Sequence, residues 1–258
     1  MPISYRVPLV TTPDPPAHAP TADDRFSPED RAVIDGFLAA YRHGAFPMAE
    51  PSVSLRGLPR RHRRIDWYIP DPRAIIAIDR PINAPGGFHI PRSLARRLRN
   101  NPFVMTSDRA FGEVIRACAA PAPGREDSWL DDRLIHAYTL LHRAGHVHSI
   151  EAWLPSDSGQ PSPLVGGIYG VALGGVFCAE SMFCRPESGG TDASKVCLAF
   201  LVRHLRTRAY QLLDVQIANQ HTARFGVVEV TNSEYQSLLR RAIDLPCNWG
   251  CLDPFWSI

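Results

Sequence analysis

Residues 164–183, LVGGIYGVALGGVFCAESMF, carry the strongest structural signal in the chain. Two runs rich in β-forming residues lie on either side of Gly174-Gly175, and a Gly-Gly pair between such runs indicates a β-hairpin. The second run holds one acid, Glu180, among residues that need apolar surroundings. A lone buried carboxylate is costly unless it is paired. Glu180 therefore either meets a structural cation, for which Lys195 is a candidate, or faces a cationic ligand.

Helical and strand patterns alternate on both sides of this hairpin. Helical periodicity predicts helices at residues 27–44, 91–100, 107–119, 131–145 and 233–242, and a long helix from Thr191 or Asp192 to Arg208. Apolar runs predict strands near residues 67–78, 146–154, 211–217 and 227–231. Residues 45–64 are expected to form a loop with a basic tail. The order predicts an α+β fold in which helices pack on a mixed sheet.

Capping residues in the sequence predict where several helices begin and end. Ser27 is expected to cap the first helix, with Pro28 at its first position and Gly44 just after its end. Ser107 or Asp108 is expected to cap the helix at residues 107–119.

Composition sets limits on the class of protein. The chain has 258 residues, 45% hydrophobic and 21% charged, with a net charge of +2, which is ordinary for a globular protein. It has no apolar run near the ~20 residues that a membrane-spanning helix needs, and its N-terminus has no apolar core of signal-peptide type. We therefore expect a cytoplasmic protein without membrane contact. Its six cysteines are expected to be reduced thiols, with a metal or redox role for the pair Cys247 and Cys251 as the lesser alternative.

Polar residues interrupt the apolar strand LLDVQIAN. Asp214 and Gln216 lie two residues apart, so their side chains share one face of the strand. That face is either a cleft or an internal polar pair. Asn219 and His221 follow directly, at a strand end where functional groups are common.

Two basic clusters lie in the N-terminal half. One comprises Arg56, Arg60, Arg61, His62, Arg63 and Arg64. In the other, Arg92, Arg96 and Arg99 share a helix face by their spacing. Such clusters are usually solvated surface, but two of them in a nearly neutral chain favour a phosphate-backbone site. Aromatic residues that could stack a base there are Phe46, Trp67, Tyr68 and Trp129.

Nine blocks, in order along most of the chain, resemble the leucyl/phenylalanyl-tRNA–protein transferase family. The blocks are AYRHGAFP, WYIPDPRAII, FHIPRSL, DRAFGEVIRACA, SWL, AYTLLHRAGHVHSIEAW, LVGGIYGVALGGVFCAESMF, ASKVCLAFL and LLDVQIANQHTARFG. The resemblance implies transfer of Leu or Phe, and less readily Met, from charged tRNA to proteins that begin with Arg or Lys. Such transfer marks proteins for N-terminal-rule degradation.

The same resemblance implies an architecture. It gives a catalytic domain like that of GNAT acetyltransferases at residues 89–258 and a smaller N-terminal domain at residues 26–88. It implies no metal and no coenzyme. Residues 1–25 are rich in Pro, Thr, Ala and Asp, and this composition predicts a flexible arm. We expect a monomer.

The resemblance also assigns roles to residues. Asp214 would orient Gln216, which with Glu180 would hold the attacking amine and help to remove its proton, while Asn219 would assist. The pocket for the transferred side chain would be lined by Ile168, Phe177, Met182, Leu198, Leu201 and Leu205. Trp129 would stack on the terminal adenosine. The tRNA phosphates would be held by Arg92, Arg96 and Arg99.

Some positions depart from the family pattern. Met48 stands where the family usually has Trp, Cys184 replaces a Ser, and the loop at residues 185–195 is longer than usual. These changes concern tRNA affinity and the accepted amino acid, and we expect the reaction to be retained. A coenzyme-A-dependent N-acetyltransferase is one alternative, which lacks a glycine-rich pyrophosphate loop before a helix. A non-catalytic binder of tRNA or basic N-termini is the other.

Overall fold

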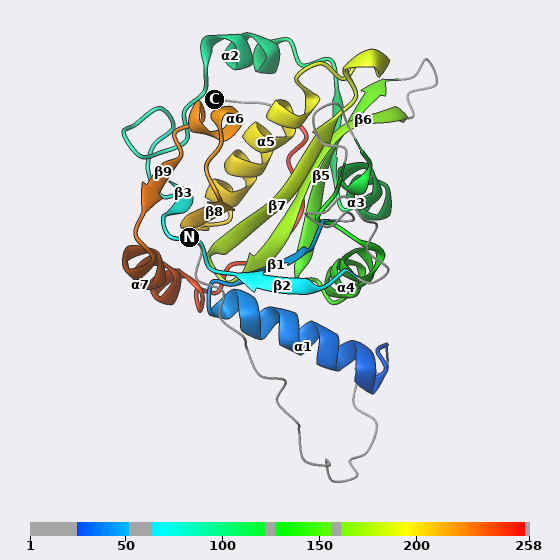
Figure 1. Ribbon diagram of the computed structural model, residues 1–258. Coiled ribbons are helices and arrows are strands. Elements are labelled where there is room, and N and C mark those ends of the chain that lie inside the picture. Colours follow the sequence, from blue (N-terminus) through cyan, green and yellow to red (C-terminus); the bar gives the residue numbers. More distant parts are fainter. Residues whose placement is uncertain (1–24, 52–62, 122–126, 156–160, 256–258) are drawn as a thin grey trace.

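Helices cover both faces of one long β-sheet in the computed structural model, which describes residues 25–51, 63–121, 127–155 and 161–255 (Figure 1). The expected arm at residues 1–25 lies almost wholly outside the described residues. So do Arg56, Arg60, Arg61 and His62 of the first basic cluster.

The sheet has seven strands in the order β4-β5-β6-β7-β8-β3-β9. They are β3 (Arg73–Ala77), β4 (Val104–Ser107), β5 (Val147–Pro155), β6 (Pro161–Leu173), β7 (Val176–Cys184), β8 (Leu212–Gln216) and β9 (Val228–Val230). Neighbours are antiparallel except β7 and β8, which run parallel. The predicted mixed sheet and the hairpin at residues 164–183, which joins β6 to β7, are therefore confirmed. A separate two-stranded sheet pairs β1 (Phe46–Ala49) with β2 (Ile65–Tyr68).

The helices divide between the two faces of the large sheet. Phe177 packs in one core cluster, whereas its neighbours Val176 and Cys178 pack in the other, as expected for side chains that alternate across a strand. The first cluster, with Phe177, also takes in α2 (Arg92–Arg99) and α5 (Ala193–Thr207), and α5 lies along the sheet in Figure 1. The second takes in α1 (Pro28–Arg42), α3 (Phe111–Ala119), α4 (Asp132–Arg143) and α7 (Asn232–Ala242). The short elements η1 (Pro186–Ser188) and α6 (Gln220–Ala223) lie in connections.

The long helices form where the sequence predicts them. Ser27 caps α1 in a reciprocal capping box with Asp30, and Pro28 is its first residue. The predicted helix after Thr191 begins at Ala193, with Asp192 at the cap position. All six cysteines are free thiols. No helix within the described ranges is long and apolar enough to cross a membrane.

Two predictions of local structure are wrong. Phe46–Ala49, expected in a loop, forms β1, and Ser107 ends strand β4 where a helix cap was expected. Helix α3 begins only at Phe111, without a side-chain cap from its N-cap residue. The N–H of its N-cap residue, Ala110, donates to the Glu151 carboxylate of β5 at 3.4 Å. A contact from a distant strand thus lies where a local side-chain cap was expected.

Candidate active site

Two β-bulges shape the place where the parallel strands β7 and β8 separate. Tyr169 pairs with Ser181 and Gly170 with Ala179, so Glu180 is the extra residue in β7. On the other side Ala74 pairs with Gln216 and Ile75 with Asp214, so Val215 is extra in β8. The parallel pairing ends at Cys178 and Asp214. Bulges re-aim side chains, and here they direct Glu180 and Gln216 at each other.

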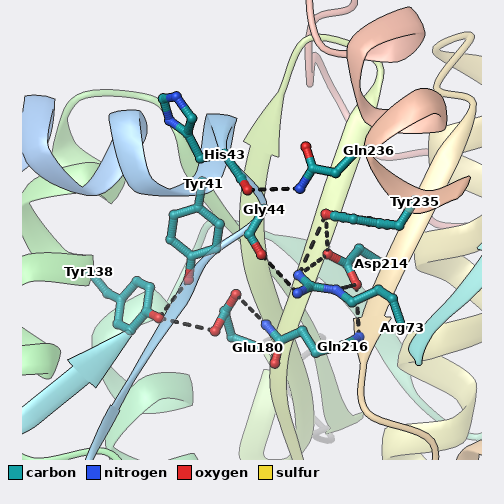
Figure 2. Close-up of polar contacts among 10 residues, drawn as sticks. All are labelled: Tyr41, His43, Gly44, Arg73, Tyr138, Glu180, Asp214, Gln216, Tyr235 and Gln236. Atoms are coloured by element: carbon teal, nitrogen blue, oxygen red, sulfur yellow. Dashed lines mark hydrogen bonds and ion pairs between the residues drawn. The ribbon is translucent and has the colours of Figure 1, made fainter. Parts of the chain in front are cut away.

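Glu180 is buried and accepts hydrogen bonds on both carboxylate oxygens (Figure 2). Nε2 of Gln216 donates to Oε1 at 2.8 Å, and the Tyr138 hydroxyl donates to Oε2 at 3.0 Å. The hydroxyl of Tyr41 lies 2.8 Å from that of Tyr138 and extends the chain of polar contacts into α1. These partners are uncharged, so Glu180 has no direct cationic partner among them.

This environment changes the acidity of the groups in it. Burial raises the pKa of Glu180 from 4.5 to about 7, and the hydrogen bonds from Tyr41, Gln216 and Tyr138 only partly offset that rise. Burial, together with the charge of Glu180, also raises the pKa of both tyrosines well above 10.0, so they remain hydroxyl donors. A carboxyl group whose pKa is near neutrality can both release and accept a proton at physiological pH.

Asp214 belongs to a second, charged half of the network. Both of its oxygens accept from Arg73, Nε to Oδ1 at 2.9 Å and Nη2 to Oδ2 at 2.5 Å, and both side chains are fully buried. The Tyr235 hydroxyl donates to Oδ2 at 2.7 Å. Burial alone would lower the pKa of Arg73, but the facing Asp214 outweighs it and the pKa is raised. Arg73 therefore keeps its charge opposite the Asp214 carboxylate.

Gln216 connects the two halves. Its backbone N–H donates to Oδ1 of Asp214 at 2.8 Å, while its side chain reaches Glu180. Its φ of 63° lies in the left-handed region, which a non-glycine residue adopts at a cost in strain. Strain of this kind collects at functional sites because the surroundings hold the residue in place.

Other predicted site residues lie farther from this centre. Lys195, suggested as the structural partner of Glu180, pairs instead with Asp192 at 2.5 Å, so that suggestion is wrong. Asn219 is exposed, and its side chain accepts from the Thr222 N–H at 2.9 Å at the start of α6. Trp129 is half-buried against the same core cluster as Met48 of β1, and it packs edge-on to Tyr138.

The six residues expected to line a side-chain pocket come together on one face of the sheet. They lie in one core cluster between α5 and the β6–β7 hairpin, where Met182 is half-buried and the other five are buried. Arg92, Arg96 and Arg99 are all exposed on α2. In the first basic cluster, the described residues have structural partners: Arg63 binds the backbone oxygens of Glu50 and Ser128, and Arg64 pairs with Asp66 at 2.8 Å.

Sequence reasoning missed Arg73, Tyr41, Tyr138 and Tyr235 as parts of the site. A signal for Arg73 was present, because it directly precedes the apolar run at residues 74–76 and a strand there buries it. Each tyrosine instead reads as an ordinary apolar position of an amphipathic helix. Within the described ranges no group of three or more His, Cys, Asp or Glu side chains is arranged to hold a metal ion.

Comparison with known proteins identifies the family. The model of the family described as leucyl/phenylalanyl-tRNA protein transferase matches residues 82–240, which include Glu180, Asp214 and Gln216. The chain belongs to this family. Its members are aminoacyltransferases, and the chain is an enzyme of that class.

Similar transferases cover most of the chain. A leucyl/phenylalanyl-tRNA–protein transferase of Novosphingobium aromaticivorans is 45% identical over 205 residues, which are 80% of this chain and 68% of the relative. That of Salinibacter ruber is 40% identical over 85% of this chain and 84% of the relative. That of Gloeobacter violaceus is 42% identical over 82% of this chain and 94% of the relative.

Proposed function

We propose that this transferase moves Leu or Phe, and less readily Met, from charged tRNA to the α-amino group of proteins that begin with Arg or Lys. The donor is supported by the names of the similar transferases. The observation that carries the site is the buried hydrogen bond between Gln216 and Glu180, at the point where β7 and β8 separate. Arg and Lys as first residues, and marking for N-terminal-rule degradation, follow from the family resemblance.

The proposed chemistry is aminolysis of an ester. A free α-amino group has a pKa of about 7.7–8.0, so a modest proton acceptor suffices. Glu180, with a pKa of about 7, is matched to that task and carries the negative charge that attracts an ammonium group. Because Nε2 of Gln216 donates to Glu180, the side-chain carbonyl oxygen of Gln216 is the atom that would accept a hydrogen bond from the incoming amine. Holding the amine and the ester together in a reactive orientation lowers the activation barrier by up to ~7–11 kcal/mol.

The aminoacyl end of the donor tRNA would contact residues from both faces of the large sheet. Ile168, Phe177, Met182 and the α5 leucines, which lie in one core cluster, would supply apolar walls for a Leu or Phe side chain. Trp129 and Met48, which pack against one core cluster, would contact the terminal adenosine. At Met48 a thioether would take the place of the tryptophan ring that the family usually has there. The exposed arginines of α2 would hold phosphates, and the exposed Asn219 would assist at the reacting centre.

The proposal includes the finer architecture. The parallel pair β7–β8, which separates at the site, and the antiparallel strands before it are compatible with a GNAT-like catalytic domain at residues 89–258. Helix α1 and the β1–β2 pair would form most of the smaller domain at residues 26–88, whereas β3 joins the large sheet. We propose that the enzyme works as a cytoplasmic monomer without a metal or coenzyme.

A transfer assay tests this function. Labelled Phe-tRNA or Leu-tRNA is mixed with a peptide that begins with Arg or Lys, without coenzyme A. Label should appear on the peptide, should not appear on the same peptide with an acetylated N-terminus, and should vanish when the tRNA is digested beforehand. No label on the free peptide, or transfer that survives digestion, would overturn the proposal.

A further inference from the structure

We propose that Arg73 is a positioning residue for aminoacyl transfer, which acts through Asp214 to fix the backbone turn that directs Gln216 at Glu180. The inference rests on the proposed function. Arg73 lies before residue 82, where the family match begins, so it is supplied by a part of the chain outside that match. Its side chain is 1% exposed, and its hydrogen bonds go to Asp214, Gly44 and Tyr235 and not to Gln216 or Glu180.

The hydrogen bonds of Asp214 show how the effect is transmitted. Oδ1 accepts from Arg73 Nε and the Gln216 N–H, and Oδ2 accepts from Arg73 Nη2 and the Tyr235 hydroxyl. A carboxylate offers about four such acceptor sites, so these four donors fill it. Asp214 therefore holds the Gln216 backbone in place and has no free acceptor for a proton from the substrate.

Arg73 also joins this carboxylate to other parts of the fold. Nη1 donates to the carbonyl of Gly44 at 2.8 Å, at the turn between α1 and β1. The guanidinium lies 4.5 Å from the ring centroid of Tyr235 and 5.3 Å from that of Phe46. A planar fork can satisfy the carboxylate with two bonds while its third nitrogen reaches Gly44, which a lysine cannot do.

The turn at Gln216 depends on this anchoring. Its φ of 63° is unfavourable for a side-chain-bearing residue, and the bond from its N–H to Asp214 holds it there. If the turn relaxes, the side-chain amide moves away from Glu180. Displacements of about 1 Å at a reacting centre reduce rates by about 100-fold.

The pair also divides charge between the two buried carboxylates. Asp214 is neutralised by Arg73, whereas the direct hydrogen-bond donors of Glu180 are uncharged. The titratable groups that interact directly with Glu180 are Tyr41 of α1, Tyr138 of α4, Cys178 of β7 and Asp214 of β8. Next to these lie Arg73 of β3 and Tyr235 of α7, which contact Asp214, and Tyr169 of β6, which interacts with Tyr138. Without Arg73, the negative charge of Asp214 near Glu180 should be uncompensated. Without the charge of Asp214, the positive charge of Arg73 should be uncompensated instead.

The first test separates geometry from charge with Arg73→Lys, which keeps the charge but loses the fork. We expect kcat for transfer from Phe-tRNA to an Arg-peptide to fall by about 100-fold. The Kd for Phe-tRNA should stay within twofold of wild type, because the proposed tRNA contacts lie elsewhere. A folded Arg73→Lys variant with wild-type kcat would overturn the positioning role, provided that wild type itself transfers; an inactive wild type overturns the proposed function instead.

The second test needs no substrate. The ¹³C NMR titration of the Glu180 carboxyl, assigned by its loss in Glu180→Gln, is compared in Asp214→Asn, Arg73→Met and the double variant. The midpoint should fall in Asp214→Asn, rise in Arg73→Met and return toward wild type in the double variant. A merely structural role would lower stability and leave these midpoints unchanged. An unchanged midpoint in Asp214→Asn overturns the inference even if Arg73→Met fails to fold.

Discussion

Gln216 donates its side-chain amide to the carboxylate of Glu180 at 2.8 Å, and each residue lies two positions beyond the last pair of the parallel β7–β8 ladder, Cys178 and Asp214. Backbone pairing between the strands thus gives way to side-chain pairing where they separate. Because the two strands share no backbone hydrogen bonds beyond this point, the carboxyl group and the carboxamide can receive an amine between them without breaking any backbone hydrogen bond of the sheet.

Glu180 should make stability depend on pH. Its pKa is about 7 in the folded chain against 4.5 as a free side chain, because burial disfavours its charge. The folded state therefore binds the proton more tightly, and the associated stability is present below pH 4.5 and is lost as the pH rises through about 7. Wild type should lose free energy of unfolding when the pH is raised from 5 to 8, as measured by urea denaturation. In Glu180→Gln, which has no carboxyl group to titrate, this loss should be smaller by roughly 2 kcal/mol. The exposed Glu113→Gln is the control and should behave as wild type; equal losses in all three proteins would show that Glu180 does not titrate as described.

The basic face of α2 should contribute to tRNA affinity. Arg96→Ala should weaken tRNA binding and reduce the slope of log Kd against log salt by about 1, since one phosphate contact is lost. Arg240→Ala, an exposed arginine on α7 at the opposite face of the sheet, should leave the slope unchanged. A slope unaffected by Arg96→Ala would make α2 ordinary solvated surface.

Gly170 should be needed for the bulge that presents Glu180. A Cβ at this position would lie 2.2 Å from the Cys178 carbonyl oxygen and 2.4 Å from Cε1 of Phe177, both on β7. Gly170→Ala should therefore lower the free energy of unfolding by about 3 kcal/mol, as overpacking does. Gly36→Ala in α1, where a Cβ meets nothing within 4 Å, should instead add about 0.5–1 kcal/mol. Thermal and urea unfolding compare the two, and equal effects would contradict the packing argument.

Much of the fold could be predicted because its long elements have clear periodicity. The β6–β7 hairpin, α4 and α5 bury regular apolar faces, and α1 carries its own capping residues. The strands β1 and β4 have four residues each, which is too short for a pattern to emerge. The N-cap residue of α3, Ala110, donates to Glu151, which is 41 residues away, so local sequence cannot show where that helix begins.

The site could be predicted only in part for the same reason. Asp214 and Gln216 share a strand, and the family resemblance joined them to Glu180. The pairing of Arg73 with Asp214 spans 141 residues, and that of Tyr138 with Glu180 spans 42. Contacts of this range depend on strand order and bulges, which no local pattern reports. Lys195, near in sequence and of the right charge, was therefore a wrong choice of partner for Glu180.

Single-turnover transfer from labelled Phe-tRNA to an Arg-peptide, compared between wild type and Gln216→Ala, tests the central claim most directly. With enzyme in excess over the labelled tRNA, saturating peptide and the fold verified by circular dichroism, Gln216→Ala should be about 100-fold slower, because the amine loses its oriented acceptor. Gln236→Ala is the matched control: this glutamine bonds the His43 carbonyl, outside the contacts of Glu180, and should transfer at the wild-type rate. A wild-type rate in Gln216→Ala would contradict the assignment of transfer to the Glu180–Gln216 pair.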